Sequence, residues 1–221
     1  MKNNTTELVF ILDRRGSMCG LESDTIGGFN SVLCEQKNAD GKAFVTTVLF
    51  DHEIKTIHDR ISIEKVPPMT SKDYQTRGTT ALIDAIGTTI DHIDSVHKYI
   101  RREDVPEKTL FVIITDGFEN ASHIYSAGKV RKAIEAHKKG KGWEFVFIGA
   151  NIDAVETAAN FGIGAERAIN YCADKIGTEK VYSAVARATV AMRNCASGSC
   201  ERDIEESFEA VNEDFRRRGN R

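Results

Sequence analysis

Acidic and hydroxyl side chains border three apolar segments of this sequence. Asp13 and Ser17 follow "LVFIL", Asp116 ends "LFVIITD", and Thr79 and Thr80 precede "ALIDAI". In an open α/β sheet, ligands bind at the carboxyl ends of strands where the strand order reverses, so we expect these side chains to meet there. Two carboxylates with hydroxyls from separate loops form a hard-oxygen site of low charge, which suits Mg²⁺ or a similar ion that keeps several waters.

Arg15 stands between Asp13 and Ser17, and alternate positions of an extended loop share one face. If its guanidinium folds inward, it can pair with Asp13 or Asp116 and take the charge position of a metal ion. If it points outward, the remaining oxygens and water can still hold an ion. A guanidinium beside a divalent cation costs roughly 1 to 4 kcal/mol at about 4 Å, depending on the effective dielectric constant. Arg15 could also clamp a partner's carboxylate directly.

Apolar runs rich in β-branched and aromatic residues predict a sheet. Four nearly continuous runs, typical of parallel strands buried on both faces, are residues 8–12, 44–50, 110–114 and 145–148. Residues 53–61 follow the second run after a very short polar turn, which favours a hairpin and one antiparallel edge strand. The segment "RAINY" supplies a sixth strand.

Helical spacing of apolar residues occurs between these strands. The predicted helices are residues 26–36, 80–101, 130–139 and the segment "DAVETAANFGI". The alternation predicts an α/β fold, namely a doubly wound, Rossmann-like, mostly parallel six-stranded sheet with one antiparallel edge strand and helices on both faces. Two further helices are expected from residue 178, the second opening on Ser199. We therefore expect a domain at 1–176 and a C-terminal helical extension at 177–221, packed on or beside it.

The composition is that of an ordinary globular chain. Its 221 residues are 41% hydrophobic and 29% charged, and 30 basic against 33 acidic side chains give a net charge of −3, so no nucleic-acid partner is expected. The apolar runs are far shorter than the roughly 20 residues of a membrane-spanning helix, and the polar start is unlike a signal peptide. Five cysteines, an odd number at scattered spacings, predict a cytoplasmic protein with reduced thiols. Cys195 and Cys200 are interpreted as incidental thiols in a linker.

The segments "FILDRRGSM", "RGTTALIDAIG" and "VIITDGFENAS" resemble the three parts of the metal-ion-dependent adhesion site (MIDAS) of von Willebrand factor A (vWA) domains. The resemblance covers residues 7–171, and "GWEFVFIGANIDAVETAANFGI" is similar to the bacterial intracellular branch of that family. The positions that match the motif residues are Asp13, Ser17, Thr80 and Asp116. Thr79 takes the place of a usual glycine. Arg15 departs from the pattern, because the family has a serine there that contacts the ion.

The resemblance implies a non-catalytic protein-binding module. An ion, Mg²⁺ or alternatively Mn²⁺ or Ca²⁺, or Arg15 in its place, would meet an acidic side chain of a protein partner. The candidate partner-binding residues are Arg15, Thr79 and Glu119. Enzyme activity is not expected, because the sequence has no phosphate-binding loop and no nucleophile elbow. The alternative is a structural or assembly subunit that uses the C-terminal helices and keeps a vestigial metal site, and nothing in the sequence specifies an oligomeric state.

Overall fold

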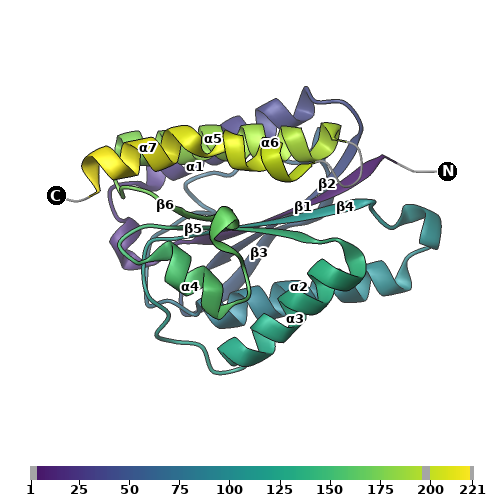
Figure 1. Cartoon of the computed structure of the whole chain (residues 1–221), viewed down its shortest axis with the longest axis horizontal. Helices are drawn as coiled ribbons and strands as arrows, with labels where there is room; N and C mark the ends of the chain where they lie inside the picture. Colours follow the sequence, from purple (N-terminus) through teal and green to yellow (C-terminus); the bar gives the residue numbers. More distant parts are fainter. Residues whose placement is uncertain (1–3, 196–199, 220–221) are drawn as a thin grey trace.

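The protein is described by a computed structural model that covers residues 4–195 and 200–219 (Figure 1). Strands β1 to β6 are Thr5–Asp13, Lys42–Phe50, Ile54–Ser62, Lys108–Thr115, Glu144–Gly149 and Ala168–Asn170. Helices α1 to α7 are Glu22–Lys37, Leu82–Tyr99, Ala127–Lys141, Ala154–Asn160, Lys175–Asn194, Cys200–Ser207 and Glu209–Arg218. The short 3₁₀ helices η1 to η4 are Gly16–Met18, Ile63–Lys65, Arg102–Asp104 and Ala165–Arg167.

The six strands form one sheet in the order β3-β2-β1-β4-β5-β6. The neighbouring pairs are parallel except β2 with β3, which is an antiparallel hairpin at the sheet edge. The predicted sheet is therefore confirmed, including its antiparallel edge strand. Because the chain builds β2 on one side of β1 and β4 on the other, the strand order reverses between β1 and β4, which is where such folds bind ligands.

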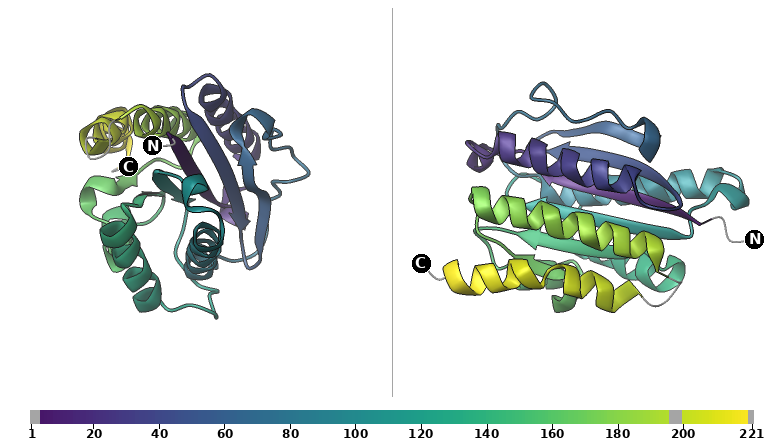
Figure 2. Two further views of the ribbon diagram at one scale, coloured as in Figure 1. Left: turned by 90° about the vertical axis from the view of Figure 1, so that its right-hand side faces the viewer. Right: turned by 90° about the horizontal axis from the view of Figure 1, so that it is seen from above.

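Helices cover both faces of the sheet (Figures 1 and 2). On one face α1, α5, α6 and α7 contribute to one core cluster, and on the other α2, α3 and α4 contribute to a second. All nine residues of β1 are buried. Leu8, Phe10 and Leu12 point to the first cluster, and Val9 and Ile11 point to the second. The continuous apolar run of this strand thus serves two layers, since successive side chains alternate between faces.

Helix α2 begins at Leu82, two positions after the predicted start at Thr80. The backbone before it is also bonded to other loops, although the Ala81 carbonyl accepts from the N–H of Ala85 in the helix. The carbonyl of Thr80 accepts hydrogen bonds from the backbone N–H groups of Asn120 and Ala121, and the N–H of Ala81 donates to the carbonyl of Asp51. These tertiary bonds, which helical periodicity does not reveal, keep Thr80 and Ala81 at the sheet edge.

The C-terminal part consists of three helices, where two were expected. Helix α5 lies against α1 so closely that a Cβ at Gly28 would overlap the ring of Tyr182, so the contact requires a glycine. The predicted boundary at residue 177 falls inside α5. A break at Phe208 separates α6 from α7, and the predicted start at Ser199 lies outside the described residues.

Helices α6 and α7 bury apolar side chains against the sheet side of the molecule. Ile204, Phe208 and Val211 are each at most 2% exposed and belong to the same core cluster as α1 and α5. This packing leaves the C-terminal helices as a cover for the chain's own core.

Cys19, Cys34 and Cys172 are free thiols, whereas Cys195 is disulfide-bonded. The expectation of reduced thiols is wrong at Cys195, because an odd number of cysteines still allows one bridge beside free thiols. Among the described helices, none combines the length and the apolar character needed to cross a membrane.

Replacing Phe208 with alanine should lower the free energy of unfolding by about 3–5 kcal/mol, because it leaves a cavity in a packed core. Urea denaturation measures this change. Tyr99→Ala, at a side chain that is 81% exposed, is the matched control and should cost less than about 0.5 kcal/mol. Equal small effects of the two changes would show that α6 and α7 do not stabilise the domain.

Candidate functional site

The predicted site residues lie at the carboxyl edge of the sheet, on the loops that follow β1 and β4 and the loop that precedes α2. Asp13, Thr80 and Asp116 are buried, and Ser17 is exposed on η1. Ser17 and Asp116 are 99 positions apart in the sequence, yet the Ser17 hydroxyl donates a 2.5 Å hydrogen bond to Oδ1 of Asp116. The loops therefore meet across the point where the strand order reverses.

Asp13 is held by hydrogen bonds on both carboxylate oxygens. Oδ1 accepts from the backbone N–H of Arg15 at 2.8 Å, and Oδ2 accepts from the Thr115 hydroxyl at 2.7 Å. The Tyr74 hydroxyl donates to the Asp13 carbonyl at 2.5 Å and fixes the strand end from the opposite face. Burial raises the pKa of Asp13 from 3.8 to about 6, against the lowering effect of these hydrogen bonds.

Asp116 is also poorly solvated. Burial raises the pKa of this carboxyl group, while the hydrogen bond from Ser17 and the nearby charge of Arg15 act in the opposite direction. Two such carboxylates side by side favour the binding of positive charge.

Arg15 adopts the inward arrangement and approaches Asp116. Its Nε lies 3.7 Å from Oδ1 of Asp116, and its side chain is 25% exposed. The guanidinium rests on Gly117, where any Cβ would overlap it. Gly117 therefore provides the space that lets Arg15 reach over the site while one part of the guanidinium stays in contact with solvent.

Two buried oxygens in the site have no hydrogen-bond partner among the described residues: Oγ1 of Thr80 and Oδ2 of Asp116. Buried polar atoms are normally satisfied, so these two oxygens are available to an ion or a water. Both are hard oxygen donors of the kind that Mg²⁺ and Mn²⁺ prefer. The donor set thus fits a small divalent cation, which Ser17, Thr80 and the two carboxylates would hold.

The loop after β4 is fixed on the start of α2 by two acidic side chains. The Glu119 carboxylate accepts from the backbone N–H groups of Ile83, Ala121 and Ser122 and from the Ser122 hydroxyl, at 2.7–2.8 Å. The Asp84 carboxylate accepts from the backbone N–H groups of residues 123–125. Asp84 therefore supports this loop. The Thr80 N–H donates to Asn120 Oδ1, which ties Thr80 to the same loop. Thr79 is exposed beside it.

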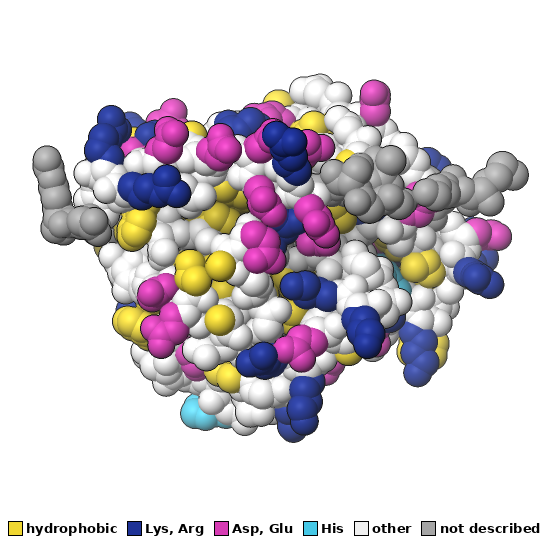
Figure 3. Space-filling view, in the orientation of Figure 1, with side chains coloured by type: hydrophobic (Ala, Val, Ile, Leu, Met, Phe, Trp, Pro, Cys, Tyr) yellow, Lys and Arg dark blue, Asp and Glu magenta, His cyan; other side chains and the backbone are white. Residues whose placement is uncertain are grey.

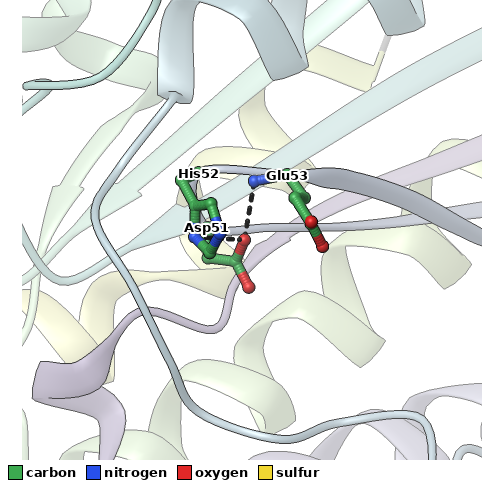
Figure 4. A group of neighbouring side chains, drawn as sticks. All are labelled: Asp51, His52 and Glu53. Carbon is green, nitrogen blue, oxygen red and sulfur yellow. Dashed lines mark hydrogen bonds and ion pairs between the residues drawn. The ribbon is translucent and has the colours of Figure 1, made fainter.

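A second charged cluster follows β2 at the same edge (Figure 4). Ligand atoms of Asp51, His52 and Glu53 lie within 4.8 Å of one another. Asp51 is fully buried, however, and its Oδ2 is 3.0 Å from Nε of both Arg14 and Arg77. Two guanidiniums thus already neutralise Asp51, which weakens the cluster as a metal site.

Asp51, His52 and Arg14 are not among the candidate residues that the sequence pattern identifies. The signal that could have found Asp51 is its position directly after an apolar strand, as for Asp13 and Asp116.

No known protein-family model matches the sequence, and no curated protein matches it. Solved structures do match in fold. The chain is similar to the ArnB paralog VWA2 from Sulfolobus acidocaldarius, with 16% identity and a TM-score of 0.54 over 85% of this chain and 45% of that one. It is similar to proximal thread matrix protein 1 from the mussel byssus with a zinc-occupied MIDAS motif, at 15% identity and a TM-score of 0.56, over 84% and 46% of the two chains.

A third neighbour is the manganese-loaded TRAP protein of Plasmodium vivax, at 14% identity and a TM-score of 0.54, over 81% of this chain and 73% of that one. The chain spans a little under half the length of the first two neighbours. These structures show that the chain has the vWA fold, which confirms the fold that the sequence motifs predicted.

The pKa of Asp13 gives stability a pH dependence. Because the folded-state pKa of about 6 lies above the ordinary 3.8, the folded protein binds this proton more tightly than the unfolded chain does. Binding of this proton stabilises the folded state. The stabilisation is fully present below the pKa of the unfolded state and is lost as the pH rises through the pKa of the folded state. The free energy of unfolding then falls by about 3 kcal/mol in total. Asp13→Asn should abolish this loss.

Urea denaturation between pH 4 and pH 7.5, in buffer with EDTA, measures the free energy of unfolding of the wild type and of Asp13→Asn. Because the two carboxylates interact, the difference between the two curves reports Asp13 together with its coupling to Asp116. Curves that stay parallel across this range would contradict the assignment.

Proposed function

We propose that this chain is a non-catalytic protein-binding module whose carboxyl edge captures an acidic side chain of a partner protein. The observation that carries the proposal is that Ser17 and the part-exposed Arg15 both approach the buried carboxylate of Asp116, whose Oδ2 has no hydrogen-bond partner among the described residues. Support also comes from the vWA neighbours, one with a zinc-occupied MIDAS and one loaded with manganese. An acidic group from outside would find positive charge at this edge.

The cation and the arginine have related roles in this proposal. A divalent ion bound by Asp13, Ser17, Thr80 and Asp116 would supply an open coordination position for a carboxylate. Arg15 supplies a planar guanidinium whose N–H groups can hold a carboxylate in a bidentate manner. Because both are positive and both face Asp116, they compete for the same compensating charge. Arg15 therefore lowers the affinity of the site for the ion. It also supplies part of the positive charge that would attract the partner's carboxylate.

Thr79 extends the proposed partner surface, and Glu119 supports that surface from the loop after β4. Thr79 is exposed next to Thr80, so its hydroxyl is available to a partner. The Glu119 carboxylate accepts hydrogen bonds from the loop after β4 and from the start of α2, so it holds that loop in place. The proposal takes Mg²⁺ as the ion and the cytoplasm as the location, in line with the resemblance to the bacterial intracellular branch.

The assembly alternative, in which the C-terminal helices bind a neighbouring subunit, has less support. Ile204, Phe208 and Val211 are buried in the chain's own core and are not available to another chain. Truncation after Asn194 should accordingly expose core and cause aggregation.

Arg15→Ser should raise the affinity for Mn²⁺ by about tenfold or more, because it removes a like charge worth roughly 1 kcal/mol or more and adds a hydroxyl ligand. Isothermal titration calorimetry or the Mn²⁺ electron paramagnetic resonance signal measures the change. Arg101→Ser, at an arginine that is 75% exposed near the opposite edge of the sheet, is the control and should leave the affinity unchanged. An unchanged affinity in Arg15→Ser would show that Arg15 does not compete with an ion.

Selection of displayed random peptides on the wild-type chain should enrich sequences that contain Asp or Glu. The charge reversal Arg15→Glu should abolish that enrichment, since it places a negative charge where the partner's carboxylate would bind. Arg101→Glu changes the net charge equally and should retain it. Enrichment of peptides without acidic residues, or equal enrichment on the two variants, would contradict acidic capture at this edge.

A further inference from the structure

A groove of about 500 Å³ opens at the carboxyl ends of β4, β5 and β6, beside the candidate site. Its lining comes from the loops after these strands and from the end of α7, and includes Phe118, Ile152, Tyr171, Ala173, Phe215 and Arg218. In Figure 3, hydrophobic side chains reach the surface between α7 and α4, on the same side of the molecule. The candidate cation site does not include this groove.

Part of the groove lining consists of apolar side chains that an occupant could cover. Phe118 is 66% exposed, although a phenylalanine side chain normally gains by burial. Tyr171 is buried, and burial raises the pKa of its phenol well above the ordinary value, so this part of the lining is uncharged.

The charged groups that line the groove already have partners. Arg218 pairs with Asp174 and Asp214. Asp153 caps α4 by accepting from the N–H groups of Val155 and Glu156, each at 3.0 Å. The charge of Arg218 is compensated within the chain, whereas the exposed Asp153 carboxylate accepts only backbone N–H groups and keeps its negative charge. Burial of apolar surface is therefore the main favourable interaction that the groove can provide.

The groove is continuous with the candidate site. Arg15 rests on Gly117, and the next residue, Phe118, lines the groove. Asn151, also in the lining, lies with its Nδ2 at 3.5 Å from the Asp116 carbonyl. Because consecutive Cα atoms are about 3.8 Å apart, one short extended peptide reaches both Arg15 and the groove.

We propose that the groove is a specificity pocket that receives a large apolar side chain from the same partner segment whose carboxylate meets Arg15 and the cation site. This inference rests on the proposed function and narrows its partner to segments that carry an acidic and a bulky apolar residue within a few positions of each other. The acidic group provides orientation, and the apolar group provides most of the buried surface.

The probes are fluorescein-labelled peptides in which Asp and Phe are separated by none to three glycines, with matched peptides that carry Ser for Phe or Asn for Asp. Fluorescence polarisation measures their binding to the full chain up to millimolar concentration. At the best spacing, Phe118→Ser should weaken binding of the Asp/Phe peptide about tenfold, because a buried phenylalanine contact is lost. Tyr99→Ser, at an even more exposed aromatic residue on α2, should change nothing.

The matched peptides separate the two proposals. The Asp/Ser peptide should bind more weakly and should not respond to Phe118→Ser. If Asp/Ser and Asp/Phe peptides bind alike, the groove proposal fails while acidic capture stands. If Asn/Phe binds as well as Asp/Phe, acidic capture fails. If none of the peptides binds, both proposals are contradicted.

The free thiol of Cys172 provides a second readout inside the groove. Peptide binding should slow the alkylation of Cys172 severalfold and leave the exposed thiol of Cys34 unchanged, as measured by mass spectrometry. Unchanged alkylation of Cys172 in the presence of saturating Asp/Phe peptide would place the apolar side chain elsewhere.

Discussion

The carboxylates of Asp13 and Asp116 lie at the ends of two neighbouring parallel strands, and both are almost completely removed from water. A buried carboxylate must be neutralised, hydrogen-bonded or paired with a cation. The architecture imposes this condition, because β1 and β4 end side by side where the strand order reverses. The surrounding loops carry the groups that neutralise these carboxylates or donate hydrogen bonds to them.

The carboxylate at each acidic strand end is compensated in a different way. Asp51, after β2, has the guanidiniums of Arg14 and Arg77. Asp13 relies on hydrogen bonds and a raised pKa. Asp116 has Ser17 and, at longer range, Arg15.

Positive charge from the chain itself therefore compensates part of the negative charge at this edge. Oγ1 of Thr80 and Oδ2 of Asp116 are buried without a hydrogen-bond partner among the described residues. In the proposed function, an external cation or a partner's groups complete the site. In the further proposal, the groove beside Phe118 adds an apolar contact.

Much of this arrangement could be predicted from the sequence. Continuous apolar runs identified the strands, and the position of Asp13 and Asp116 directly after two of them placed both carboxylates at one edge. The inward direction of Arg15 was not predictable, because it depends on the space above Gly117. The pairing of Asp51 with Arg14 and Arg77 depends on loops far apart in the sequence. The groove depends on how α7 returns to the ends of β5 and β6, which no local pattern encodes.

The central claim is that the guanidinium of Arg15 compensates the charge of Asp116 within the folded chain. The most direct test is a pH titration of the Asp116 side-chain carboxyl carbon by ¹³C nuclear magnetic resonance, in metal-free buffer, for the wild type and Arg15→Ser. The account predicts that the pKa of Asp116 rises further when Arg15 is removed, because burial then acts with less opposition. A pKa that is the same in both proteins would contradict it.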